Sequence, residues 1–156
     1  MNKLSSMTLA ALLVTASASA AVSEQTWGDW FGNTGGMEFA LNSMNKAGEQ
    51  LTISCGDHQM VVTYQQIQEN YSATSVEGLK DVYLMINDKK YGLDNDRPLR
   101  GDAIPAQQAF DALKQSGPKD KIAFTSLQSG GSKPFSARGL AQALKDVSWQ
   151  DCMDQP

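Results

Sequence analysis

The chain has 156 residues, of which 41% are hydrophobic and 19% charged, and its formal net charge at pH 7 is −4. A chain of this length can bury one core of its own, which indicates a single folded domain. Nucleic acids and anionic membranes are bound through basic surfaces, so the negative charge argues against both as partners.

The N-terminal segment has the features of a secretory signal peptide. Lys3 precedes an apolar run over residues 7–14, and small residues follow up to Ala20. This order is typical of a cleaved export signal. The apolar run is shorter than the about 20 residues that a membrane-spanning helix needs. We therefore predict a signal peptide over residues 1–20, cleavage near Ala20 or Ala21, and a periplasmic or secreted domain over residues 21–156.

Alternating apolar and polar residues predict strands in the first half of the exported chain. Phe39 and Leu41 alternate with small or polar residues, and Leu51, Ile53 and Cys55 share one face of the next strand. The letters GDH mark a turn, and QMVVTYQQI (59–67) returns as an antiparallel strand.

The second half mixes strands with helices. After a polar stretch (68–80), DVYLMI (81–86) predicts a strand that turns through NDKK. A charged run without periodicity, DNDRPLRGDAIP (94–105), predicts an exposed loop. Ala106, Ala109, Phe110 and Leu113 have helical spacing after Pro105, which suits a first helical turn.

A further strand and a second helix complete the chain. DKIAFTSLQ (120–128) predicts the strand, and SGGSKP (129–134) a flexible connection. FSARGLAQALKDV (135–147) predicts an amphipathic helix with Ser136 as its N-cap. The fold class is therefore α+β, a mainly antiparallel sheet of five to seven strands with two C-terminal amphipathic helices packed on one face.

The chain has two cysteines, Cys55 and Cys152. An even cysteine count in an exported protein favours a disulfide, and no other pairing is available. A closed loop of this size contributes about 4.7 kcal/mol in the chain-entropy model. The bridge would staple the end of the chain to the central sheet.

His58, the only histidine, follows Cys55 by three residues. A thiolate at Cys55 with His58 as its base is one hypothesis for a hydrolase, but it requires a reduced thiol outside the cytoplasm. The chain has no C-x-x-C and no H-E-x-x-H motif, so we predict no catalytic residue, metal site or cofactor.

The charged loop supplies the predicted binding residues Asp94, Asp96, Arg97 and Arg100. Asp94 and Asp96 resemble the start of a calcium loop, but Pro98 stands where a third oxygen ligand belongs. Exposed loops on rigid scaffolds commonly carry binding residues, which favours a contact with another protein.

Trp27 and Trp30 offer a second predicted binding surface. Aromatic side chains of this kind form stacking platforms for glycans or proteins, or else close the two ends of a domain over its core. Both interpretations fit tryptophans near the start of the exported chain and Trp149 near its end.

The last third of the chain, around KPFSARGLAQALKDV (133–147), resembles the C-terminal part of invasion-associated locus B-type proteins of proteobacteria. The likeness is carried by Phe135-Ser136, Gly139-Leu140 and Ala143-Leu144. It implies a small envelope or secreted protein with a binding or host-association role, and it assigns no site residue.

The leading hypothesis is a non-enzymatic protein-binding module of the bacterial envelope, with an inhibitor or immunity protein against an envelope-acting enzyme as a specific form. The alternatives are a small periplasmic hydrolase using Cys55 and His58, and a cell-wall or glycan-binding module using Trp27 and Trp30.

Overall fold

The computed structural model describes residues 24–35, 38–79, 81–101 and 103–156. The predicted signal peptide and its cleavage site at Ala20 or Ala21 lie outside these residues. None of the helices in the described ranges has the length and apolar character needed to cross a membrane.

The first half of the chain forms one antiparallel sheet in which each strand pairs with the next in sequence. Its strands are β1 (Gln25–Trp27), β2 (Trp30–Asn33), β3 (Phe39–Met44), β4 (Glu49–Gly56), β5 (Gln59–Gln66) and β6 (Tyr71–Thr74). The predicted α+β class and the dominant antiparallel sheet are confirmed.

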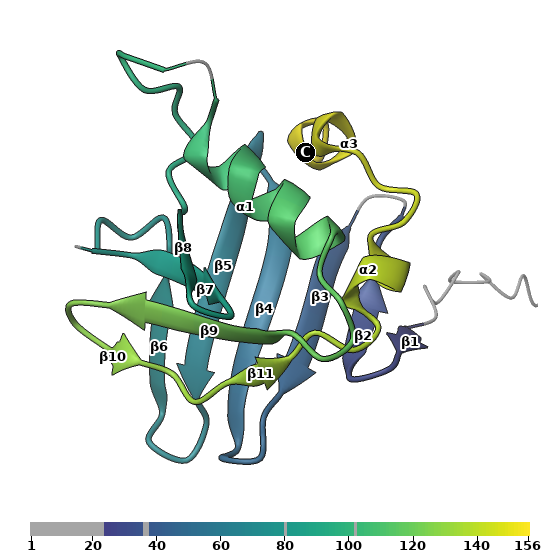
Figure 1. Cartoon of the computed structure of the whole chain (residues 1–156), viewed down its shortest axis with the longest axis vertical. Helices are drawn as coiled ribbons and strands as arrows, with labels where there is room; N and C mark the ends of the chain where they lie inside the picture. The colour runs from purple at the N-terminus through teal and green to yellow at the C-terminus, as the bar shows by residue number, and fades with distance from the viewer. Residues whose placement is uncertain (1–23, 36–37, 80, 102) are drawn as a thin grey trace, which may run out of the picture.

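The described residues of the second half form a smaller antiparallel sheet and three helices, and β7 lies between β8 and β9 in that sheet. The elements are β7 (Tyr83–Ile86), β8 (Lys89–Gly92), α1 (Pro105–Lys114), β9 (Lys121–Ser126), β10 (Gly130–Gly131), β11 (Phe135–Ser136), α2 (Leu140–Ala143) and α3 (Trp149–Met153). In Figure 1 the second sheet crosses in front of the first, and the helices cover the rest of the same face.

The register explains why this face is apolar. Leu41 lies opposite Ile53, which lies opposite Val62, and all three are fully buried. Successive side chains alternate between the faces of a sheet, so the intervening residues, such as Thr52 and Thr63, lie on the other face. From the second half, α1 buries the predicted stripe at Ala106, Ala109, Phe110 and Leu113, and β9 buries Ile122 and Phe124.

Three details differ from the prediction. Residues 71–74 of the polar stretch form β6, and the connection at 129–134 contains the short strand β10. The predicted second helix is limited to α2, because residues 135–136 pair with β9 as β11. Ser136 is therefore a strand residue, and Gly139 is the N-cap of α2.

Candidate functional site

The loop between β8 and α1 projects from the body of the protein, at the top of Figure 1. The predicted binding residues Asp94, Asp96, Arg97 and Arg100 are all exposed, as the sequence indicated. Leu99 is the most exposed of the large hydrophobic side chains described. The loop thus presents an apolar side chain between charged ones.

The base of this loop is held in place by hydrogen bonds. The Asn95 side chain accepts a hydrogen bond from the backbone N–H of Met60 at 2.8 Å and donates one to its carbonyl oxygen at 2.9 Å. The N–H of Ala106 donates to the carbonyl oxygen of Asp94 at 2.9 Å. Because both ends are attached to rigid elements, the tip at Pro98, Leu99 and Arg100 projects from a fixed position.

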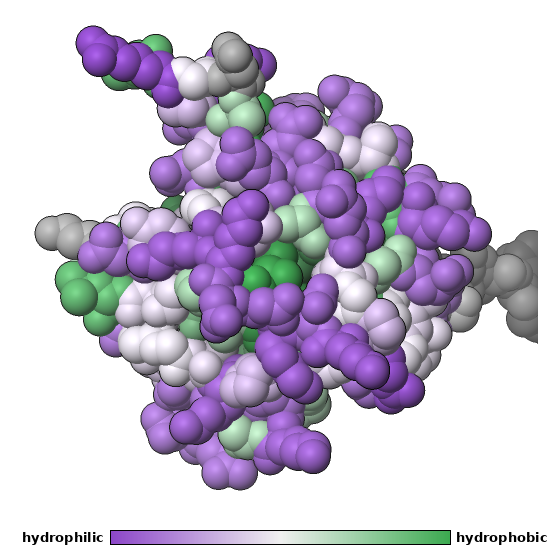
Figure 2. Space-filling model, in the orientation of Figure 1, coloured by the Kyte–Doolittle hydropathy of each residue, from purple (hydrophilic) through white to green (hydrophobic). Residues whose placement is uncertain are grey.

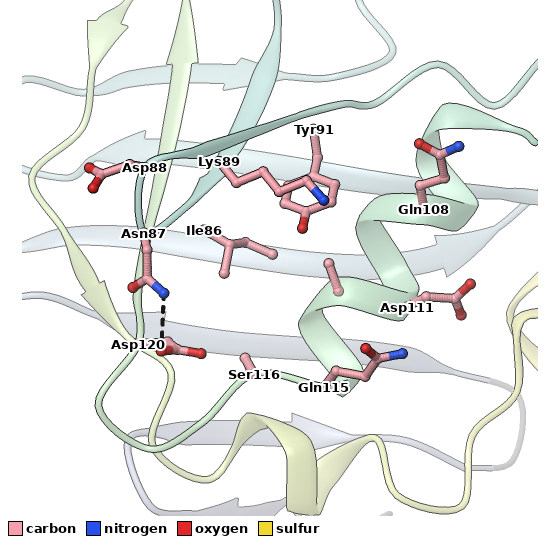
Figure 3. A pocket seen from close by; sticks show the side chains of 11 residues that line it. Ile86, Asn87, Asp88, Lys89, Tyr91, Gln108, Asp111, Gln115, Ser116 and Asp120 are labelled. Carbon is pink, nitrogen blue, oxygen red and sulfur yellow. Dashed lines mark hydrogen bonds between the residues drawn. The ribbon is translucent and has the colours of Figure 1, made fainter.

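A groove lies between α1 and the β7–β8 hairpin. The loop follows the last strand of this hairpin and leads into α1. Its cavity volume is about 890 Å³. Figure 2 shows a hydrophobic area there, surrounded by hydrophilic residues, and Figure 3 shows the lining side chains. Ile86 and Ala112 are its aliphatic residues, whereas Gln108, Asp111 and Gln115 line it from α1.

Charge in the groove is mainly negative. Of the described residues, Asp88, Asp111 and Asp120 line it together with one cation, Lys89, whose ammonium lies 5.1 Å from the ring centre of Tyr91. An excess of carboxylates around an aliphatic floor suits a partner that brings basic and apolar side chains. No sequence pattern indicates this groove, because its two walls come from separate elements.

Asp120 also fixes the local backbone. It accepts hydrogen bonds from the N–H of Gly117 at 2.7 Å and from the Asn87 amide at 3.1 Å, the dashed line in Figure 3. These hydrogen bonds hold the pKa of the Asp120 carboxyl below its usual value, and the bond from Gly117 has the larger effect. Asp120 is therefore already hydrogen-bonded and charged at neutral pH.

The predicted disulfide is confirmed, with an S–S distance of 2.01 Å between Cys55 of β4 and Cys152 of α3. The Cys55 sulfur is therefore not a thiol that could act as a nucleophile. His58 lies in the β4–β5 turn, where its Nδ1 lies 2.6 Å from the carbonyl oxygen of Met153 in α3, and a proton on that nitrogen would complete a hydrogen bond. Both residues hold the C-terminal helix against the sheet.

The two tryptophans predicted as a platform are not presented together. Trp30 has an exposed fraction of 0%, and its indole N–H donates to the Ser136 carbonyl oxygen at 2.8 Å. Trp27 is half-buried against the same core. Because a stacking platform needs open ring faces, Trp30 is a core residue here and the alternative role, closing the ends of the domain, describes it better.

No group of three or more histidine, cysteine or acidic side chains in the described ranges is arranged to hold a metal ion. A scan against protein-family models, a search of curated proteins and a search of solved structures each found no match to this chain.

Proposed function

We propose that this protein is an exported binding module that captures another protein through the loop at residues 94–101 and the adjoining groove. The proposal rests on the difference between the base of the loop, which is hydrogen-bonded, and its tip, which is exposed. Its base is tied to Met60 and Ala106, whereas its tip is exposed and includes Leu99. A loop held in this way loses less conformational entropy when a partner binds it.

The groove lies next to β8 and α1, the two elements that the loop connects, although none of its lining residues belongs to the loop. A partner that receives Leu99 in an apolar pocket would place a neighbouring basic patch opposite Asp88 and Asp111. An inhibitor or immunity protein is the specific form of this proposal, with the loop inserted into the cleft of an envelope enzyme and substrate excluded.

The test is capture of partners from an envelope extract by the immobilised, exported protein. We expect Leu99→Ser, and the charge reversal Arg97→Glu with Arg100→Glu, to weaken capture of any partner of this surface. Asp111→Lys should weaken the same capture by repelling a basic patch.

The matched control is Lys119→Glu with Lys145→Glu, which makes the same charge change at exposed positions outside the loop and the groove. Thermal unfolding of each variant verifies that it is folded. A partner retained equally by all loop and groove variants would exclude this surface from binding.

A further inference from the structure

A second pocket, with a cavity volume of about 580 Å³, lies on another part of the molecule. Lys46 contributes from the β3–β4 turn, Lys121 from β9 and Lys133 from the segment between β10 and β11. These segments meet near the lower end of the first sheet in Figure 1, away from the projecting loop. No described residue lines both this pocket and the groove between α1 and the β7–β8 hairpin, although Lys121 directly follows Asp120 of that groove.

The pocket concentrates positive charge in an acidic protein. Arg138 pairs with Asp29 and Lys145 with Asp146, and no ion pair between described residues involves Lys46, Lys121 or Lys133. Among the described residues Asp29 is the one carboxylate that lines the pocket, and Arg138 binds it through two hydrogen bonds, of 2.6 and 3.1 Å. With Asp29 already paired, the three ammonium groups leave a positive excess at the pocket.

The turn that carries Lys46 and the segment that carries Lys133 are joined by hydrogen bonds. The side-chain amide of Asn45 donates to the Lys133 carbonyl oxygen at 3.2 Å, and its oxygen accepts from the N–H of Ala47 at 3.0 Å. The N–H of Lys133 donates to Glu49 Oε2 at 2.9 Å. These bonds fix the backbone beneath both lysines before any ligand arrives.

Glu49 does not cancel the charge of the lysines by pairing with their ammonium groups. Its Oε2 accepts from Asn45 at 2.6 Å as well as from the Lys133 N–H, and its Oε1 accepts from the Tyr64 hydroxyl at 2.7 Å. Both carboxylate oxygens of Glu49 are thus bound to neutral donors, and Glu49 is not among the residues that line the pocket.

The backbone of Lys121 is held by a hydrogen bond and by strand pairing. Its N–H donates to the Asn87 side-chain oxygen at 3.0 Å, and β9 places it opposite Ser136 of β11. Met44, Ala47 and Pro134 add apolar surface to the pocket, and Met44 is 49% exposed. The pocket therefore combines ammonium groups with an accessible apolar wall.

We propose that this pocket binds a phosphate ester that carries an apolar group. Lysine ammonium groups act as point charges that suit phosphate oxygens, and an ester with a hydrophobic substituent would also cover the apolar wall. The volume lies within the range of about 300–1,000 Å³ that is usual for small-molecule sites. The ester could come from a soluble metabolite or from a lipid headgroup, because both present the same chemistry.

Titration calorimetry of the exported protein with phenyl phosphate at low ionic strength tests the pocket. We expect saturable binding that is tighter than binding of inorganic phosphate, because only the ester covers the apolar wall. Lys46→Gln with Lys133→Gln should weaken phenyl phosphate binding by about 25-fold, from about fivefold for each ammonium lost.

The control pair, Lys119→Gln with Lys145→Gln, removes the same charge outside the pocket and should change the affinity by less than about twofold, the size of a screened effect at a distance. Equal weakening by both pairs, or no binding at millimolar phenyl phosphate, would overturn the proposal.

Cosedimentation with vesicles of phosphatidylglycerol and phosphatidylcholine identifies the source of the ester. Vesicle binding that phenyl phosphate displaces supports a lipid headgroup, whereas phenyl phosphate binding without vesicle binding supports a soluble ester. Vesicle binding that survives Lys46→Gln with Lys133→Gln and resists displacement contradicts the assignment of the phosphate to this pocket.

Discussion

The side-chain amide of Asn95 pairs with both backbone groups of Met60, at 2.8 and 2.9 Å. The β5–β6 pairing covers residues 63–66 of β5, so Met60 lies beyond it. Asn95 thus takes the place that the peptide group of a neighbouring strand would have, and it joins the projecting loop to the edge of the first sheet.

Replacing Asn95 by alanine should lower the free energy of unfolding by about 1–3 kcal/mol, because Met60 is buried and its N–H loses its partner. Urea unfolding measures the loss, and faster amide exchange at Met60 locates it. The control Asp96→Ala alters an exposed neighbour in the same loop and should change stability by less than about 0.5 kcal/mol. Equal effects of the two variants would show that the amide pair does not anchor the loop.

Replacing both cysteines by alanine should lower the free energy of unfolding by about 4 kcal/mol, because Cys55 and Cys152 are 97 residues apart and the bridge restricts the unfolded chain. Urea unfolding of the oxidised protein and of the double variant gives this difference. Intact mass under denaturing conditions provides the check: the oxidised protein should be two hydrogens lighter than the reduced chain and take up no thiol label. Labelling of both cysteines in protein purified without reductant would contradict the bridge.

Gly139 should not tolerate a side chain. Its φ is 93°, and an added Cβ would lie 1.9 Å from the carbonyl oxygen of Trp27, a backbone atom that cannot rotate away. We expect Gly139→Ala to lower the free energy of unfolding by more than about 3 kcal/mol, the sum of a left-handed conformation and a steric clash.

Gly130→Ala is the matched control, because Gly130 also has a positive φ, of 66°, but an added Cβ would meet nothing within 4 Å. Gly130→Ala should lower the free energy of unfolding by only about 1–2 kcal/mol, which is the cost of the left-handed conformation for alanine. Similar losses for both variants would show that the contact between Gly139 and Trp27 is unimportant.

The raised pKa of Tyr64 should make the stability of the protein depend on pH in the alkaline range. Burial, followed by the hydrogen bond to Glu49, raises the pKa of the Tyr64 hydroxyl from 10.0 to about 12. The fold therefore favours the neutral phenol. This stabilisation is complete below the unfolded pKa and is lost as the pH rises through the folded pKa, with a size on the order of 2–3 kcal/mol.

The measurement compares wild type with Tyr64→Phe, since phenylalanine keeps the ring and does not titrate. The variant should be less stable by about 1 kcal/mol near pH 9, where it lacks the hydrogen bond to Glu49. As the pH approaches about 12, the wild type should lose stability relative to the variant. A difference that stays constant between these pH values would contradict the raised pKa.

Local sequence patterns predicted much of the fold because the residues concerned interact with their near neighbours. The alternation through Leu51, Ile53 and Cys55 became the buried face of β4, and the helical spacing from Ala106 to Leu113 became the buried stripe of α1. The disulfide was predictable because two cysteines allow one pairing. Exposure of Asp94, Asp96, Arg97 and Arg100 also followed from composition, since a charged, aperiodic run has no apolar face to bury.

Residues 135–139 show where local pattern fails. Phe135 and Ala137 are both buried at the spacing of two that is typical of a strand, but Ala137 also lies three residues before Leu140 and seven before Leu144, which is helical spacing. Contacts with residues distant in sequence decide that this segment is a strand and not a helix. Phe135 pairs with Ile122, and Gly139, whose backbone is left-handed, packs against Trp27. The burial of Trp30 also involves this segment, because its indole N–H donates a hydrogen bond to the Ser136 carbonyl oxygen.

By itself, the sequence determined the main strands β3, β4, β5, β7 and β9, the first helix, the cysteine pairing and the exposed loop, since each follows from local periodicity, composition or parity. Only the tertiary structure decided the groove between α1 and the β7–β8 hairpin, the anchoring of the loop by Asn95, and the meeting of Lys46, Lys121 and Lys133 at one pocket. The physical reason is that hydrogen bonds and packing between segments far apart in the chain bring these side chains together, and no periodicity within one segment encodes them.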